Sequence, residues 1–427
     1  MKYVVLIIDG ASGWPVATLG GRTSLEAAHI PNLDRLAREA TVGMAHTVPE
    51  GMEASSAVAC MSVLGFDPSR YYAGRGPIEA MAMGIDLAPG QVAMRCNLVN
   101  ISAGIMTSYS AGNISSAEAA ELVAALQAGL GDERLEFHHG VGFRHILTIR
   151  DGAEMLETTF APPHDITDQA VAGRGPEGPG AGLTESLMER SRAILAGHPV
   201  NETRIARGQL PATQIWLFWP GMRPEAMPTF DRAYDGKRAA LTSAVDLLRG
   251  LALQTGMDFV SLPGVTDGLD NDFAGQMTGA LDALDDHDVV FVHVEAPDEA
   301  SHAGDVVEKV RAIEEVDRLM VPLVLALREG PSPTVAGDRF DDAVAGERSD
   351  HATEEVSLLV LPDHPTPLEI KTHVAEPVPF LMWGPGFEAN GAQAFTETEA
   401  RATGLAVAPG HLLMGRLLSG HCPASRR

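Results

Sequence analysis

Three apolar runs without polar alternation constrain the fold of this chain most. They lie at residues 3–8, directly after Asp288, and at 356–361. Such runs are typical of strands that are buried on both faces of a parallel sheet. Helical patterns alternate with these strands along the chain, which indicates βαβ units. We therefore expect an α/β fold in which a mainly parallel sheet is flanked by helices.

Helical spacing of apolar residues marks the segments between the strands. A helix is predicted to begin at Pro31, because proline suits the first turn and apolar residues recur on one face. In the helix at 304–328, Lys309 and Glu314 are expected on the exposed surface. Further helices are predicted at 184–197 and 237–252, and further strands at 214–220, 259–262 and 378–383.

Each of the three apolar runs leads into residues that can bind metal ions. These residues are Asp9, Asp298, His302, Asp363 and His364. The carboxyl ends of parallel strands meet at one edge of a sheet, where open α/β folds bind ligands. Asp298 and His302 are four residues apart, so they share a face if the chain becomes helical after Pro297. Taken alone, Asp9 also fits a residue that caps a turn.

A serine pair at the start of a helical pattern is a candidate nucleophile. Residues 47–68 pass from an extended Pro/Gly stretch into a helix that begins near Ser55 and Ser56. A hydroxyl at a helix N-terminus lies beside unpaired N–H groups, which favour an alkoxide and the phosphate that it accepts. The alternative is that one of the serines only caps the helix.

Three carboxylates, three imidazoles and one hydroxyl make up the predicted metal-binding set. Its members are Asp9, Ser56, Asp298, His302, Asp363, His364 and His373. Mixed oxygen and nitrogen ligands suit two borderline divalent ions such as Zn²⁺ or Mn²⁺, about 4 Å apart, that clamp a phosphoryl group. The set therefore predicts phosphoryl transfer. Asp350 and His351 resemble another ligand pair, but they precede the strand in a polar stretch, and we predict that they are not ligands.

Short strand patterns from residue 91 onward indicate an inserted domain. Segments 98–101, 146–149 and 156–160 surround one helix, in which Ser115 and Glu118 form a capping box. We expect a small α+β cap domain at 91–175, inserted into a core formed by 1–90 and 176–427. Its candidate substrate-binding residues are Arg95, Arg144, His145, His164 and Asp165, with Arg75 just before it; each also fits a structural role.

Charge and cysteine content exclude several classes of function. The net charge of −26 argues against nucleic acid or an anionic membrane as a partner. Three cysteines without CxxC spacing argue against a disulfide framework and against a cysteine-only zinc site. Because no stretch reaches the roughly 18 apolar residues of a membrane span, we expect a cytoplasmic enzyme, with a homo-oligomer left open.

Motifs along nearly the whole chain resemble a known family, the archaeal-type cofactor-independent phosphoglycerate mutases of the alkaline phosphatase superfamily. The motifs are Ile8–Gly10, Thr23–Ala28, Tyr72–Ala80, Ala296–His302 and Pro362–Pro367 followed by His373. The resemblance implies an alkaline-phosphatase-like core with a cap that binds phosphate. It also implies one ion at Asp298, His302 and His373, and a second at Asp9, Ser56, Asp363 and His364, the metals being Mn²⁺ or Zn²⁺, with Mg²⁺ as a further choice. Ser56 would be the phosphorylated nucleophile, and Lys237 would lie near the site.

Motifs in the middle of the chain resemble a branch of that family proposed to act as homoserine kinases. They are Met94–Val99, Tyr109–Ser115, Val141–Leu147 and Ile215–Pro224. The first hypothesis for the function, implied by this resemblance, is a homoserine-kinase-like phosphotransferase that acts on a small hydroxy acid or amino acid, with ATP as donor. Since no P-loop is present, the metals and the cap would hold ATP. The alternatives are mutase chemistry, and a regulatory relative suggested by the altered stretch Ala54–Cys60 around Ser56.

Overall fold

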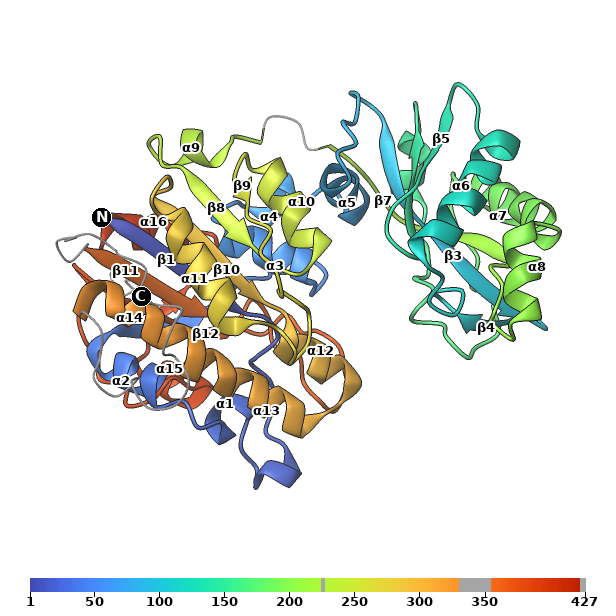
Figure 1. Ribbon diagram of the computed structural model, residues 1–427. Coiled ribbons are helices and arrows are strands. Elements are labelled where there is room, and N and C mark those ends of the chain that lie inside the picture. Colours follow the sequence, from blue (N-terminus) through green and yellow to red (C-terminus); the bar gives the residue numbers. More distant parts are fainter. Residues whose placement is uncertain (224–226, 330–354, 423–427) are drawn as a thin grey trace. The chain divides into compact units, whose positions relative to one another are not determined.

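An eight-stranded sheet forms the centre of the larger of two units in the computed structural model, which describes residues 1–223, 227–329 and 355–422. The larger unit comprises Met1–Tyr72 and Met227–Arg427, and the smaller comprises Ala73–Ala226 (Figure 1). The sheet order is β13-β2-β12-β11-β1-β10-β8-β9. The strands are β1 (Lys2–Ile8), β2 (Thr41–Ala45), β8 (Ala239–Thr242), β9 (Asp258–Phe259), β10 (Val289–Val294), β11 (Val356–Leu361), β12 (Val378–Trp383) and β13 (Ala406–Val407).

The first apolar run of the sequence becomes the central strand of this sheet. β1 pairs in parallel with both β10 and β11, and every residue in Val4–Ile8 is fully buried. Ile8 is opposite Val294, and Ile7 is opposite Leu361. The chain therefore leaves all three strands at the same edge of the sheet, as the apolar runs predicted.

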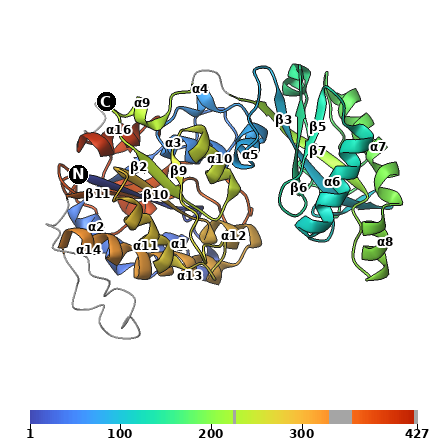
Figure 2. The ribbon, with the colours of Figure 1, turned by 45° about the horizontal axis from the view of Figure 1, so that its top comes forward.

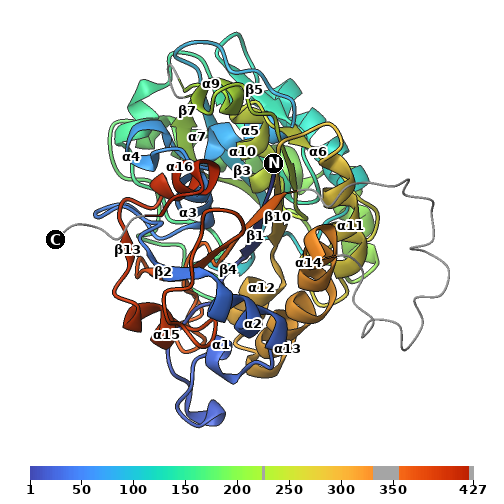
Figure 3. The same ribbon diagram turned by 90° about the vertical axis from the view of Figure 1, so that its left-hand side faces the viewer.

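Two groups of helices cover the two faces of this sheet (Figure 3). One face packs against α2 (Pro31–Glu39), α11 (Phe273–Ala283), α13 (Val306–Glu315) and α14 (Val321–Glu329). The opposite face carries α3 (Ser56–Val63), α10 (Asp246–Gln254) and α16 (Leu412–Ser419). The mainly parallel α/β architecture expected from the sequence is confirmed.

Two predicted helices differ in detail from the structure. The predicted helix 237–252 begins instead with β8, because Ala239–Thr242 pairs with β10 and is buried there, whatever its local preference for helix. The predicted helix 304–328 consists of α13, a π-helical segment η3 (Val316–Met320) and α14. Lys309 is fully buried, so its predicted surface position is wrong.

An antiparallel five-stranded sheet with one helical layer on each face forms the smaller unit (Figure 2). Its strands are β3 (Val92–Ser102), β4 (Ile105–Ser108), β5 (Leu135–His138), β6 (Arg144–Ile149) and β7 (Gln214–Met222). One face is covered by α6 (Ser116–Leu130), α7 (Ala181–Ala196) and α8 (Pro199–Ala206), and the other by α5 (Arg75–Ala82). The predicted capping box at Ser115 and Glu118 begins α6.

The inserted unit is larger than the predicted 91–175. It extends over Ala73–Ala226 because β7 pairs along β3, and because α7 and α8 contribute Leu187, Leu195 and Val200 to its core. The predicted core of 176–427 includes the apolar run of β7, because its composition matches that of the strands in the larger sheet, but β7 belongs to the smaller sheet. The predicted strand 156–160 is also wrong, since Ala153–Glu157 forms a 3-10 helix. Within the described residues, no helix is long and apolar enough to cross a bilayer.

We expect the stability of the inserted unit to depend strongly on Arg204. Its guanidinium is buried, pairs with Glu118 at 2.7 Å, and donates to the carbonyls of Leu210 and Ala111 at 2.9 and 2.8 Å. Arg204→Met should destabilise the unit by roughly 2–4 kcal/mol, because buried carbonyls lose their donors. Hydrogen exchange of peptides from β3 and β7 measures this loss, and exposed Arg192→Met should change it by less than about 0.5 kcal/mol.

Candidate active site

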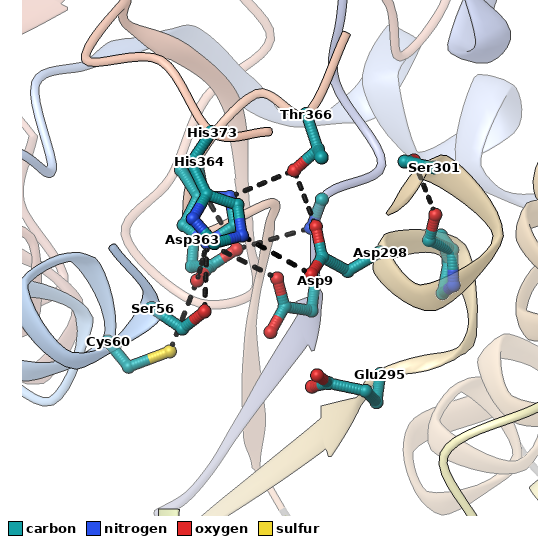
Figure 4. Close-up of polar contacts among 12 residues, drawn as sticks. Asp9, Ser56, Cys60, Glu295, Asp298, Ser301, Asp363, His364, Thr366 and His373 are labelled. Carbon is teal, nitrogen blue, oxygen red and sulfur yellow. Dashed lines mark hydrogen bonds and ion pairs between the residues drawn. The ribbon is translucent and has the colours of Figure 1, made fainter. Parts of the chain in front are cut away.

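Strand ends bring the predicted ligands together at one edge of the larger sheet (Figure 4). Asp9 follows β1, and Asp363 and His364 follow β11. After β10 the chain enters α12 (Ala296–Ala303), which carries Asp298 in its first turn and His302 in its last. Gly10 has a φ of +61°, and a side chain there would collide with Asp298 Oδ1, so the turn after β1 requires glycine.

Asp298, His302 and His373 form the first candidate metal-binding group. Asp298 Oδ2 lies 3.0 Å from His302 Nε2 and 3.5 Å from His373 Nε2, and the two imidazole nitrogens are 3.0 Å apart. His302 Nδ1 must be protonated, because it lies 2.9 Å from the carbonyl of Lys371, which can only accept. The Nε2 atom of a neutral His302 then carries a lone pair that can bind a metal ion. Asp298, His302 and His373 together could hold that ion.

The second candidate group surrounds His364. Its Nε2 lies 3.2 Å from Asp363 Oδ2, 3.6 Å from Asp9 Oδ1 and 3.0 Å from the hydroxyl of Ser56. The side chains of Asp9, Asp363 and His364 are fully buried. Asp363 Oδ1 accepts the N–H groups of Gly10 and His364 at 3.3 and 2.8 Å, which fixes the orientation of its carboxylate.

His293 and Glu295 also belong to this site, and sequence reasoning missed both. His293 Nε2 lies 2.8 Å from Asp9 Oδ2 and 3.6 Å from Glu295 Oε2, and the three residues form a further group that could hold a cation. His293 Nδ1 is 3.0 Å from Ser243 Oγ. The sequence signal that could have identified them is a histidine within the apolar strand and a glutamate directly after that strand, close to Asp298 in the sequence.

Four carboxylates lie close together at this edge, and their mutual repulsion favours the binding of cations. Burial, followed by repulsion from Asp363 and Glu295, raises the pKa of Asp9 well above its ordinary value. The pKa of Glu295 is also raised well above its ordinary value, first by burial and then by Asp298. Burial raises the pKa of Asp298 too, but hydrogen bonds with His302 and His373 outweigh it and leave the pKa well below the usual range. Carboxylates and imidazoles that crowd in this way fit divalent metal ions.

Ser56 lies at the first position of α3, directly after the residue that caps the helix. Ser55 is the N-cap and makes no capping hydrogen bond through its side chain, while Ser56 Oγ faces His364. Of the two serines, Ser55 thus takes the N-cap position that was the alternative for one of them, and Ser56 does not. One turn later, the thiol of Cys60 donates to Asp363 Oδ2 at 3.4 Å, and burial raises the pKa of this thiol well above its ordinary value.

Three of the six predicted substrate-binding residues lie near Phe218 and Trp219 in the inserted unit. The guanidinium of Arg75 stacks on Trp219 at 4.4 Å, and the ring of His164 lies 5.4 Å from the same indole. Arg95 is 5.9 Å from the ring of Phe218. Glu79 pairs with both Arg75 and Arg95, so the two cations are held side by side.

The remaining candidates of this unit have local partners. His164 Nε2 lies 3.6 Å from Asp165 Oδ1. Arg144 and His145 begin β6, where Arg144 stacks on Phe143 at 5.6 Å. Burial, with His139 and Arg95 as lesser causes, lowers the pKa of His145 to about 3, so this imidazole is neutral and accepts the N–H of Gly140 at 3.1 Å.

Comparison with known proteins gives relatives along the full chain. The family model described as 2,3-bisphosphoglycerate-independent phosphoglycerate mutase matches residues 37–201, and that of the metalloenzyme superfamily matches 334–419. A phosphoglycerate mutase of this name from Methanothrix thermoacetophila is 42% identical over 98% of this chain and 100% of the relative. The chain belongs to the 2,3-bisphosphoglycerate-independent phosphoglycerate mutases.

Other phosphoglycerate mutases of this family extend the similarity. The protein from Methanosarcina barkeri is 41% identical over 98% of this chain and 99% of the relative. Among solved structures, a Pyrococcus horikoshii protein has a TM-score of 0.77 at 25% identity, covering 100% of this chain and 98% of the other. A cofactor-independent phosphoglycerate mutase from Thermoplasma acidophilum has a TM-score of 0.61 at 25% identity, covering 98% and 99% of the two chains.

Membership of the phosphoglycerate mutase family reverses the order of two predicted activities. The chain is an enzyme of the metal-dependent phosphotransfer class, as expected, and divalent metal ions agree with the metalloenzyme match and the ligand groups. The homoserine-kinase-like function was placed first, yet the relatives carry the name of the mutase, which was placed second. The middle motifs that favoured the kinase lie in the inserted unit, away from the metal ligands in sequence.

Two further predictions about site residues have different outcomes. Lys237, which the family resemblance placed near the site, precedes β8, and its ammonium lies 5.3 Å from the ring of Tyr3 at the start of β1. Because β1, β8 and β10 are parallel, Lys237 is at the opposite edge of the sheet from Asp9, and the prediction is wrong. Asp350 and His351, predicted not to be ligands, lie outside the described residues.

The position of Lys237 leads to a prediction about the kinetics of a variant. Lys237→Met should leave kcat and KM for phosphoglycerate within about twofold of the wild type, because β1 separates the lysine from the ligands by six residues at about 3.3 Å each. Steady-state kinetics with 3-phosphoglycerate measure this, with His364→Ala as an inactive control. A tenfold loss of kcat in Lys237→Met would contradict the placement.

Proposed function

We propose that this enzyme interconverts 3-phosphoglycerate and 2-phosphoglycerate without added bisphosphoglycerate, through a phosphoserine at Ser56. The observation that carries the proposal is the position of Ser56 Oγ, 3.0 Å from His364 Nε2 and beside the buried carboxylates. Full-length relatives with the mutase name support the same reaction. The retained geometry of Ser56 also favours an active enzyme over the regulatory relative that the altered Ala54–Cys60 stretch suggested.

Two divalent ions complete the proposed site. Asp298, His302 and His373 would hold one ion, which the distances between their ligand atoms support. Asp9, Ser56, Asp363 and His364 would hold the other. Asp9 and His364 cluster there together with Asp298, and Asp363 Oδ2 lies 3.2 Å from His364 Nε2. Imidazole ligands suit Zn²⁺ and carboxylate ligands suit Mn²⁺, so these mixed sets fit either ion. Bound ions of this kind supply positive charge for phosphoryl oxygens and lower the pKa of a coordinated hydroxyl.

Ser56 is the nucleophile in the first half of the proposed reaction and the leaving group in the second. Its Oγ bonds to the phosphorus of 3-phosphoglycerate while the bond from phosphorus to the substrate oxygen breaks, and the serine proton passes to that oxygen. The other hydroxyl of the glycerate then takes the phosphoryl group from Ser56 and returns a proton. As the first residue of α3, Ser56 lies beside N–H groups that stabilise the added negative charge.

The inserted unit supplies the proposed groups for the anionic substrate. We place Arg75, Arg95 and His164 in this role because they gather around Phe218 and Trp219. Glu79 holds both arginines, so their positions are set before substrate binds. Arg144, His145 and Asp165 are nearby candidates within the same unit.

Removing the nucleophile tests the phosphoserine directly. Ser56→Ala should lower kcat by at least about 10³-fold, because the covalent route is lost, and incubation with ³²P-labelled 3-phosphoglycerate should label the wild type alone. Ser55→Ala is the matched control, since its hydroxyl makes no capping bond to α3. A Ser56→Ala protein with wild-type turnover would disprove the proposed nucleophile.

Metal removal tests the second part of the proposal. Dialysis against EDTA should abolish turnover, and Mn²⁺ or Zn²⁺ should restore it, with about two ions per chain measured by plasma mass spectrometry. His302→Ala should reduce the metal content to about one ion per chain, because it removes a ligand of the first group alone. Full activity of the EDTA-treated protein would contradict the metal-dependent mechanism.

A further inference from the structure

The side chain of Thr366 contacts both candidate metal groups and is a member of neither. Thr366 is fully buried, and its hydroxyl donates to Asp298 Oδ1 at 2.5 Å (Figure 4). The same oxygen lies 3.2 Å from His364 Nδ1. Thr366 therefore contacts a carboxylate of the first group and an imidazole of the second.

These contacts determine which nitrogen of His364 carries the proton. A carboxylate such as Asp298 can only accept, so the one proton of the Thr366 hydroxyl is used on Asp298. The hydroxyl oxygen must then accept a proton from His364 Nδ1. His364 Nε2 is left with a lone pair, which faces Ser56 Oγ and Asp363 Oδ2 as a metal ligand requires.

Buried Lys309 holds Thr366 in place from the other side. Its ammonium donates to the carbonyls of Thr366 at 2.9 Å and Ser12 at 3.2 Å, and Thr366 N–H donates to the same Ser12 carbonyl at 3.0 Å. Ser12 follows β1, and Thr366 follows β11. Lys309 thus joins the two loops that carry Asp9 and His364. Burying an ammonium costs free energy, which these backbone contacts and the nearby carboxylates offset.

We propose that Thr366 and Lys309 are positioning residues that set Asp298 and His364 at the spacing needed to bind two ions as a pair. The inference rests on the two-ion site proposed above. Thr366 orients one ligand of each group, and Lys309 fixes the backbone of Thr366. Neither residue touches the substrate or the reacting atoms in this role.

Metal affinity of a threonine variant tests the proposal. Thr366→Val keeps the shape and removes the hydroxyl, so equilibrium dialysis with Mn²⁺ should show both dissociation constants raised roughly 10–100-fold. Thr366→Ser keeps the hydroxyl and should stay within about threefold of the wild type. His302→Ala, by contrast, should weaken one ion and leave the other within about threefold.

Thr255→Val is the matched control for the loss of a buried hydroxyl. Thr255 is also fully buried, but its hydroxyl donates to the carbonyl of Leu251 at the end of α10. This variant should lose a similar amount of stability in urea unfolding while both ions bind as in the wild type. Lowered metal affinity in Thr366→Val alone would therefore separate positioning from a general loss of stability.

Lys309→Met tests the second residue through a double-mutant cycle. The single variant should also weaken both ions, and the double variant with Thr366→Val should weaken them by less than the product of the single effects. Wild-type affinity for both ions in Thr366→Val would overturn the proposal, as would a wild type that binds fewer than two. A wild type that binds two ions but shows no mutase turnover would instead overturn the proposed reaction and leave this inference standing.

Discussion

Repulsion between like charges is the constraint on which the rest of the proposed site depends. Asp9, Glu295, Asp298 and Asp363 are held together where three parallel strands end, and burial adds to the cost of their charge. The sheet can tolerate this cluster because its central strands are mainly apolar, buried and paired on both sides. The stability that the buried sheet contributes thus compensates for the repulsion between the carboxylates at its edge. Cations that bind there reduce this repulsion and stabilise the folded state.

Strand ends were the part of the site that sequence could predict. The apolar runs at 3–8 and 356–361 are unambiguous, and parallel pairing places whatever follows them at one edge. Asp9, Asp363 and His364 are next to those runs, so their convergence needs no tertiary detail. His302 was predictable for a related reason, because helical spacing alone puts it on the same face as Asp298.

Residues whose role depends on a distant partner were not predictable in this way. Lys309 has the spacing of a surface residue in a helix, and only the approach of the Ser12 and Thr366 loops shows why it is buried. The extent of the insertion was missed for the same reason, since β7 resembles a core strand until it is seen paired with β3. Local patterns identify an apolar strand, but they do not say which sheet it joins.

Strand order in the larger sheet has a consequence for the synthesis of this enzyme. β1 (Lys2–Ile8) is synthesised well before its two neighbours in the sheet, β10 and β11, which are made after residue 288. The inserted unit is one continuous stretch of chain, so it can fold while β1 still lacks partners. The apolar strand β1 must therefore stay unpaired until β10 and β11 have been made, and nascent chains with such exposed strands are prone to aggregate and need chaperones.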